Sequence, residues 1–171
     1  MRITIDLQAC QTESRLRGIG RYAMGLTKAL LAGRREHDEY LLGVDKTYPA
    51  TIGDIHRELE PVGGYAGLLG YAYPKPTRAH GPEDALRPAA EALIRQRYSA
   101  ASSEVIHVNS LFEGFIEHAG GLGQLARMPG AVSSVTLYDL IPEIFPQLYL
   151  GAADQRWWYR RKLLDLCQFE S

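Results

Sequence analysis

The sequence predicts an α/β fold in which a mostly parallel sheet carries helices on both faces. Two observations predict it. The chain opens on a strand-like alternation, passes through a glycine loop into a helical pattern, and returns to a second apolar run. Two further strand-like runs follow, after a stretch with helical spacing. A strand, helix, strand order needs a crossover connection, which makes the two strands parallel and leaves helices to cover the sheet.

The first three elements have clear patterns. Residues 2–7 alternate, with Ile3, Ile5 and Leu7 on one face, which indicates a strand. After a polar stretch at 8–17, apolar residues from 19 to 30 recur three and four positions apart, which predicts an amphipathic helix. Residues 39–44 form a short apolar run between turn residues, typical of a buried strand.

The later elements are less regular. A short helix is expected at 51–59, followed by residues 61–82, which are rich in Gly, Pro and Tyr. Because this stretch has no periodicity, it is interpreted as a flexible loop, either functional or disordered. The other expected elements are a helix from 86, strands at 104–108 and 132–138, and a helix at 152–168.

Composition narrows the class of protein. The 171 residues hold 19 Lys+Arg against 20 Asp+Glu, so a net charge of −1 gives no attraction for nucleic acid. Cys10 and Cys167 are the two cysteines, too few and too far apart for a disulfide framework or a thiolate zinc site. The five histidines lack metal-ligand spacing, and no Asp-x-Asp occurs, so no metal is expected. The expected location is the cytoplasm.

The first candidate site is the glycine loop Gly18-Ile19-Gly20, where a helix opens after a strand. Missing side chains let a phosphate approach the backbone, and the first helical N–H groups favour an anion. Arg17 and Arg21 flank the loop and could add charge-assisted contacts. The alternative is a tight turn in which the glycines allow close packing.

The second candidate site consists of polar residues expected at the carboxyl ends of strands, the edge where α/β sheets bind ligands. Tyr138 and Asp139 follow one strand, and Asp139 could bond a sugar hydroxyl or assist proton transfer. The alternative is that Asp139 caps the turn made with Pro142. Asn109 and Ser110, with Glu113, follow the neighbouring strand. His107 is interpreted as a bonded core residue within that strand rather than a base.

A third feature is the helical run 156–162, which mixes two tryptophans and a tyrosine with four cations. It is interpreted either as a solvated face over an apolar seam or as a surface that contacts lipid headgroups. The second alternative would place the protein peripherally at the inner face of the cell membrane.

The order of these motifs resembles the N-terminal half of a family 4 glycosyltransferase of the GT-B class. Two motifs are the most specific, Arg17-Gly-Ile-Gly-Arg-Tyr22 and Tyr138-Asp-Leu-Ile-Pro142. Matching segments also occur at 2–7, 105–115 and 158–164, so the resemblance spans nearly the whole chain. The similar subgroup contains bacterial mannosyltransferase-type enzymes that build polysaccharide or lipopolysaccharide chains.

The resemblance implies a retaining transfer of a mannose-like sugar from a nucleotide-sugar donor to a glycan or lipid-linked acceptor, without metal or cofactor. Gly18, Ile19, Gly20 and Arg21 would approach the donor phosphates. Tyr138 and Asp139 would face the sugar and acceptor, with Asn109, Ser110 and Glu113 nearby. Many family members have a histidine where Tyr138 stands, and a tyrosine is a poor base near neutral pH.

The resemblance also implies that residues 1–171 are a single Rossmann-like, acceptor-side domain, a truncated fragment without the C-terminal nucleotide-sugar domain. The groups that stabilise the departing phosphate belong to that second domain, so the chain alone is expected to be inactive. In this interpretation the tyrosines of 61–82 form an acceptor lid. The alternatives are a stand-alone Rossmann-like module that binds a nucleotide or phosphate, and a scaffold that uses the aromatic and basic helix.

Overall fold

The computed structural model describes residues 1–74, 77, 85–115 and 117–169. Its centre is one five-stranded parallel sheet with the strand order β3-β2-β1-β4-β5. The strands are β1 (Arg2–Asp6), β2 (Glu39–Asp45), β3 (Gly67–Tyr71), β4 (Val105–Val108) and β5 (Val132–Val135). This order and the parallel pairing confirm the predicted Rossmann-like α/β class.

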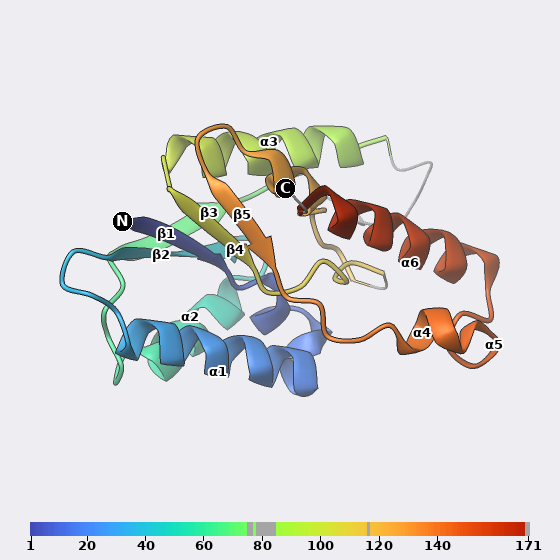
Figure 1. The fold of residues 1–171 in the computed structure, drawn as a ribbon, viewed down its shortest axis with the longest axis horizontal. Helices are drawn as coiled ribbons and strands as arrows, with labels where there is room; N and C mark the ends of the chain where they lie inside the picture. The colour runs from blue at the N-terminus through green and yellow to red at the C-terminus, as the bar shows by residue number, and fades with distance from the viewer. Residues whose placement is uncertain (75–76, 78–84, 116, 170–171) are drawn as a thin grey trace.

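Helices cover both faces of the sheet, as the sequence predicts. The helices α1 (Gly18–Ala32) and α2 (Pro49–Leu59) lie on one face, and α3 (Arg87–Ala100) lies on the other (Figure 1). Buried apolar side chains fill both interfaces, among them Ile5 and Leu42 on the α1 side and Ile106 on the α3 side. The central strands are therefore shielded from water on both faces, as is typical of parallel sheets, whereas the edge strand β5 stays partly exposed.

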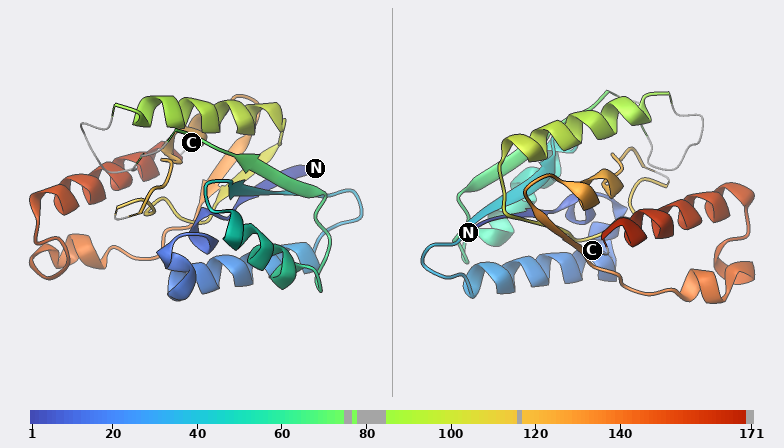
Figure 2. Two further views of the ribbon diagram at one scale, coloured as in Figure 1. Left: turned by 180° about the vertical axis from the view of Figure 1, so that it is seen from behind. Right: turned by 45° about the horizontal axis from the view of Figure 1, so that its top comes forward.

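The last third of the chain extends beyond the carboxyl ends of the strands. After β5 come two one-turn helices, α4 (Ile141–Ile144) and α5 (Pro146–Tyr149), and then the long helix α6 (Ala153–Leu166). Figure 2 shows in both views that these three helices lie past the end of the sheet rather than on one of its faces. They therefore build a wall beside the edge at which parallel sheets bind ligands.

A buried carboxyl group stands at the end of the central strand. Asp6 is fully buried, and its Oδ2 accepts hydrogen bonds from the hydroxyls of Tyr98 (2.5 Å) and Tyr71 (3.2 Å), while its Oδ1 accepts the N–H of Gln8 (2.9 Å). Tyr98 reaches it by passing Gly43, where a Cβ would lie 2.1 Å from the tyrosine oxygen. Burial raises the pKa of Asp6 to about 6, against the lowering effect of the Tyr98 bond.

Four segments differ from what the sequence predicts. The stretch 61–82, expected as a loop, contains β3, whose glycines and tyrosine hide its strand pattern; residues 75–76 and 78–82 lie outside the described part. The strand expected at 132–138 ends at Val135, and the helix expected at 152–168 ends at Leu166 and continues as a 3₁₀ turn. The polar stretch 8–17 forms two 3₁₀ turns, Gln8–Cys10 and Glu13–Leu16.

Within the described residues, no helix is long and apolar enough to cross a membrane.

The Asp6 carboxyl makes stability depend on pH. Because its pKa is raised from 3.8 to about 6 on folding, its contribution is complete below pH 3.8 and is lost as the pH rises through about 6. We expect the free energy of unfolding by urea to fall by up to about 3 kcal/mol across this window. Asp6→Asn should remove this decrease, since the amide is neutral throughout; the exposed Asp154→Asn should keep it. Identical pH profiles for all three proteins would contradict the assignment.

Candidate active site

A cleft of about 310 Å³ opens at the carboxyl edge of the sheet. Its walls come from the start of α1, the segments that follow β4 and β5, and the beginning of α6. We call it the aromatic cleft, and it is lined by Ser14, Arg17, Ile19, Phe112, Tyr138, Asp139, Pro142, Tyr149, Leu150, Trp158 and Tyr159. Larger hollows occur elsewhere, but this one occupies the edge at which the fold class binds its ligands.

Aromatic rings in edge-on and tilted contact line the aromatic cleft. The ring centroid of Phe112 lies 6.0 Å from that of Trp158 and 5.2 Å from that of Tyr159. The Trp158 Nε1 and the Tyr159 hydroxyl are buried and have no hydrogen-bond partner in the described part of the chain. Unsatisfied buried donors are costly, and a ligand hydroxyl that reached them would remove that cost. Flat apolar faces beside such donors suit the ring of a sugar.

The glycine loop combines the two alternatives that the sequence leaves open. At Gly20 a Cβ would lie 2.4 Å from the Arg15 Cα and 2.5 Å from the Ser14 carbonyl oxygen, so this glycine permits close packing of α1 against the preceding 3₁₀ turn. At Gly18 a Cβ would meet nothing within 4 Å, so the backbone there is open to a ligand. Ile19 lines the aromatic cleft between them.

Tyr138 and Asp139 both line the aromatic cleft, although neither belongs to β5. The Tyr138 hydroxyl donates to the Ile19 carbonyl oxygen at 3.4 Å, and its ring meets Tyr22 edge-on at 5.5 Å. Burial raises the pKa of Tyr138 further above its ordinary value, so the phenol is a hydrogen-bond donor and not a base. Asp139 is exposed, and its Oδ1 accepts the N–H of Ile141 at 3.0 Å, which caps the first turn of α4.

Asn109, Ser110 and Glu113 are buried beneath the aromatic cleft and do not line it. The Asn109 amide donates to the Asp6 carbonyl oxygen at 2.8 Å, and the Ser110 Oγ accepts the N–H of Phe112 at 3.2 Å. The Glu113 Oε2 accepts the Thr12 hydroxyl at 2.5 Å, and burial raises the pKa of this carboxyl. The bonds of Asn109 and Glu113 join the end of β1 and the segment after it to the segment after β4, whereas the Ser110 bond stays within the latter segment.

The arginine at the aromatic cleft is Arg17. It lines the cleft and forms an exposed ion pair with Glu13 at 3.7 Å, whereas Arg21 is exposed outside the cleft.

Tyr149 also lines the cleft, and sequence reasoning missed it together with Phe112. The sequence shows only that Phe112 follows a predicted strand and that Tyr149 is an aromatic residue further along the chain. The fold is needed to bring these two residues together. His107 lies in β4 and bonds Ser134 at 2.9 Å, as expected for a structural histidine.

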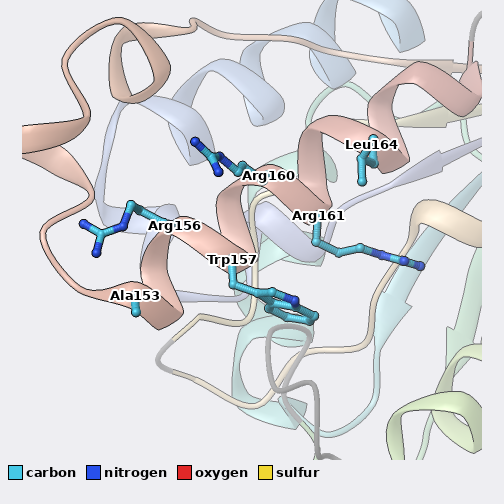
Figure 3. A pocket seen from close by; sticks show the side chains of 6 residues that line it. All are labelled: Ala153, Arg156, Trp157, Arg160, Arg161 and Leu164. Carbon is cyan, nitrogen blue, oxygen red and sulfur yellow. The ribbon is translucent and has the colours of Figure 1, made fainter.

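The two tryptophans of α6 face different surroundings. Trp158 points into the aromatic cleft, whereas Trp157 lines a hollow of about 430 Å³ on the outer side of the helix. Figure 3 shows this hollow, lined by Ala153, Arg156, Trp157, Arg160, Arg161 and Leu164. The guanidinium of Arg87 lies 5.8 Å from the Trp157 ring centroid. The helix therefore presents a basic and aromatic outer surface, while its inner side completes the cleft.

No three His, Cys, Asp or Glu side chains in the described residues are placed to hold a metal ion. Metal independence remains a prediction.

The chain is similar to one mannosyltransferase. It is 28% identical over 172 aligned positions to the serotype-specific mannosyltransferase WbdA of Escherichia coli. The alignment covers 96% of this chain and 20% of WbdA, so the chain spans about a fifth of that relative's length. No protein family profile matches the sequence, and no solved structure matches it.

The two glycines of the loop should respond differently to alanine. Gly20→Ala should lower the free energy of unfolding by about 1–3 kcal/mol, because the added methyl group meets backbone atoms that cannot move independently. Gly18→Ala should keep or slightly raise stability, because alanine favours a helix and the space is open. Gly25→Ala, also open and within α1, is the matched control. Equal effects at positions 18 and 20, measured by urea unfolding, would contradict this division.

Proposed function

We propose that this chain is the acceptor-side domain of a family 4, GT-B glycosyltransferase that transfers a mannose-like sugar from a nucleotide-sugar donor. The acceptor is a glycan or a lipid-linked sugar of cell-surface polysaccharide synthesis. The observation that carries the proposal is the similarity to a mannosyltransferase along 96% of the chain. The Rossmann-like fold and a cleft at its ligand-binding edge support it.

The side chains of the aromatic cleft suit the acceptor half of this reaction. Tyr149 and Trp158 offer ring faces to the apolar side of a sugar. The Tyr138 hydroxyl donates its proton to the Ile19 carbonyl oxygen, so its oxygen can accept a hydrogen bond from a sugar hydroxyl. Asp139 accepts a hydrogen bond from the acceptor hydroxyl and orients it toward the donor sugar. In the transfer, the bond from the anomeric carbon to phosphate oxygen breaks, a bond to the acceptor oxygen forms, and the proton of the acceptor hydroxyl passes to the departing phosphate.

The start of α1 suits the donor phosphates. The space at the Cβ position of Gly18 is open, and Gly18 begins a 15-residue helix, whose N-terminus favours an anion. Arg17 is the cation that lines the adjoining cleft, and a departing diphosphate needs more positive charge than one paired arginine provides. We therefore expect the 171-residue chain to bind sugar and to show negligible turnover by itself, without need of a metal.

Sugar binding to the isolated chain tests this proposal. Titration with methyl α-mannoside, followed by saturation-transfer NMR and tryptophan fluorescence, should show saturable binding. Tyr149→Ala should weaken it about fivefold, because removal of an exposed stacking face costs about 1 kcal/mol. Leu93→Ala, an exposed residue of α3, is the control and should bind like the parent.

Failure of the parent chain to bind any sugar would contradict the proposed function. Binding of inorganic phosphate without any sugar would favour a stand-alone phosphate-binding module instead.

We also propose that the protein contacts the cytoplasmic membrane surface peripherally. The α4–α5 segment exposes six large apolar side chains: Leu140, Ile141, Ile144, Phe145, Leu148 and Tyr149. Ile144 and Leu148 are 65% and 73% exposed, far more than a water-facing helix requires. Arg156 donates to the Leu150 and Gly151 carbonyl oxygens at the end of this segment, which joins it to the basic outer surface of α6. Apolar side chains flanked by arginines suit an anionic lipid surface.

Vesicle co-sedimentation tests the membrane contact. The chain should sediment with phosphatidylglycerol vesicles more than with phosphatidylcholine vesicles, and less as salt increases. The double variant Ile144→Ser, Leu148→Ser should lose most of this binding, while Leu93→Ser should retain it. Absence of binding by the parent chain, or equal binding by the double variant, would rule out this surface as the contact.

A further inference from the structure

A second pocket of about 240 Å³ adjoins the aromatic cleft. The two hollows share the wall formed by Ser14, Arg17, Phe112, Tyr149, Leu150 and Trp158. The second pocket adds Glu13, Phe115, Glu117 and Gln155, whereas Tyr138 and Asp139 line the aromatic cleft alone. Both hollows therefore open on the same aromatic wall, with the proposed reacting groups at one end.

The second pocket extends the shared aromatic wall by one ring, that of Phe115. In the second pocket the Phe115 ring lies 5.1 Å from the Trp158 ring centroid, and Trp158 in turn contacts Phe112, which lines both hollows. The Phe115 ring thus lengthens the aromatic wall beyond the part that both hollows share. A ligand with two sugar rings would cover this longer wall, whereas a single sugar would leave part of it empty.

The charge of the second pocket selects against phosphate. Glu13 and Glu117 supply two carboxylates, and the one cation in its lining, Arg17, pairs with Glu13 at 3.7 Å. A diphosphate placed there would face like charges across a small space. Sugar hydroxyls would instead donate hydrogen bonds to the same carboxylates. The electrostatic environment thus suits a neutral polyhydroxyl group.

We infer that the acceptor is a glycan of at least two neutral sugar units, with its terminal unit beside Tyr138 and Asp139 and the preceding unit in the second pocket. A single sugar on a lipid diphosphate would place its phosphates against Glu13 and Glu117 and is disfavoured. This inference rests on the proposed function and decides between the two acceptor classes that the function leaves open.

Three small ligands separate these alternatives on the 171-residue chain. Methyl α-mannoside represents one unit, an α-linked mannobiose two units, and mannose 1-phosphate one unit with a phosphate at the position of the preceding sugar. By NMR titration, the mannobiose should bind about fivefold or more tightly than methyl α-mannoside. Mannose 1-phosphate should bind no more tightly than methyl α-mannoside.

Charge-neutralising variants test the role of the carboxylates. The double variant Glu13→Gln, Glu117→Gln keeps the size of the side chains and should strengthen mannose 1-phosphate binding about threefold or more, with methyl α-mannoside unchanged. The exposed Glu36→Gln is the control and should leave all three affinities unchanged. The affinity for mannose 1-phosphate should change less with salt concentration in the double variant than in the parent, because fewer carboxylates repel the phosphate.

The outcomes distinguish the inference from the function beneath it. Equal affinities for the mannobiose and methyl α-mannoside would overturn the two-unit acceptor and leave the proposed function standing. Tightest binding of mannose 1-phosphate to the parent chain would also overturn it, in favour of the lipid-linked acceptor. If none of the three sugars bound, both the inference and the proposed function would fail.

Discussion

The bonds around Asp6 fix the geometry on which the cleft depends. This carboxyl ends the central strand, and its partners come from β3, from α3 and from the loop that follows β1. Its own carbonyl oxygen accepts the amide of Asn109, which follows β4. One buried residue therefore sets where two loops leave the sheet. Two walls of the aromatic cleft, at Arg17 and at Phe112, follow those two loops, so the bonds of Asp6 help to set the distance between these walls.

The site has two layers with different duties. In the lower layer Thr12 bonds Glu113 and Ser110 bonds the backbone of Phe112, all shielded from water. In the upper layer Tyr149, Trp158 and Tyr138 present their rings to the cleft. Because a buried unpaired polar group is costly, changes in the lower layer act mainly on folding. Changes in the upper layer act on binding, since these side chains already meet solvent or one another.

Local patterns in the sequence predict the elements whose periodicity is intact. The strands β1 and β2 and the helix α1 are recovered because each buries a regular face. The sequence does not predict β3, because its glycines and its position at the edge of the sheet remove the alternation of apolar and polar residues. At Gly70 the space that a side chain would fill is taken by the Lys46 side chain. The sequence cannot predict that Gly20 allows close packing while Gly18 faces open space. The Arg15 backbone that lies against Gly20 is placed there by a 3₁₀ turn. Nor can the sequence predict the positions of Phe112 and Tyr149, which converge from separate segments.

The two hollows share one wall but differ in charge. The start of α1 favours an anion through the helix dipole. The second pocket holds two carboxylates, Glu13 and Glu117, and Glu13 pairs with Arg17, which lines both hollows. The carboxylate without that partner, Glu117, therefore carries most of the preference for hydroxyl donors. In the function that we propose, donor phosphates lie near Gly18 and the acceptor extends from Asp139 toward Glu117, so that its terminal hydroxyl meets the proposed reacting groups.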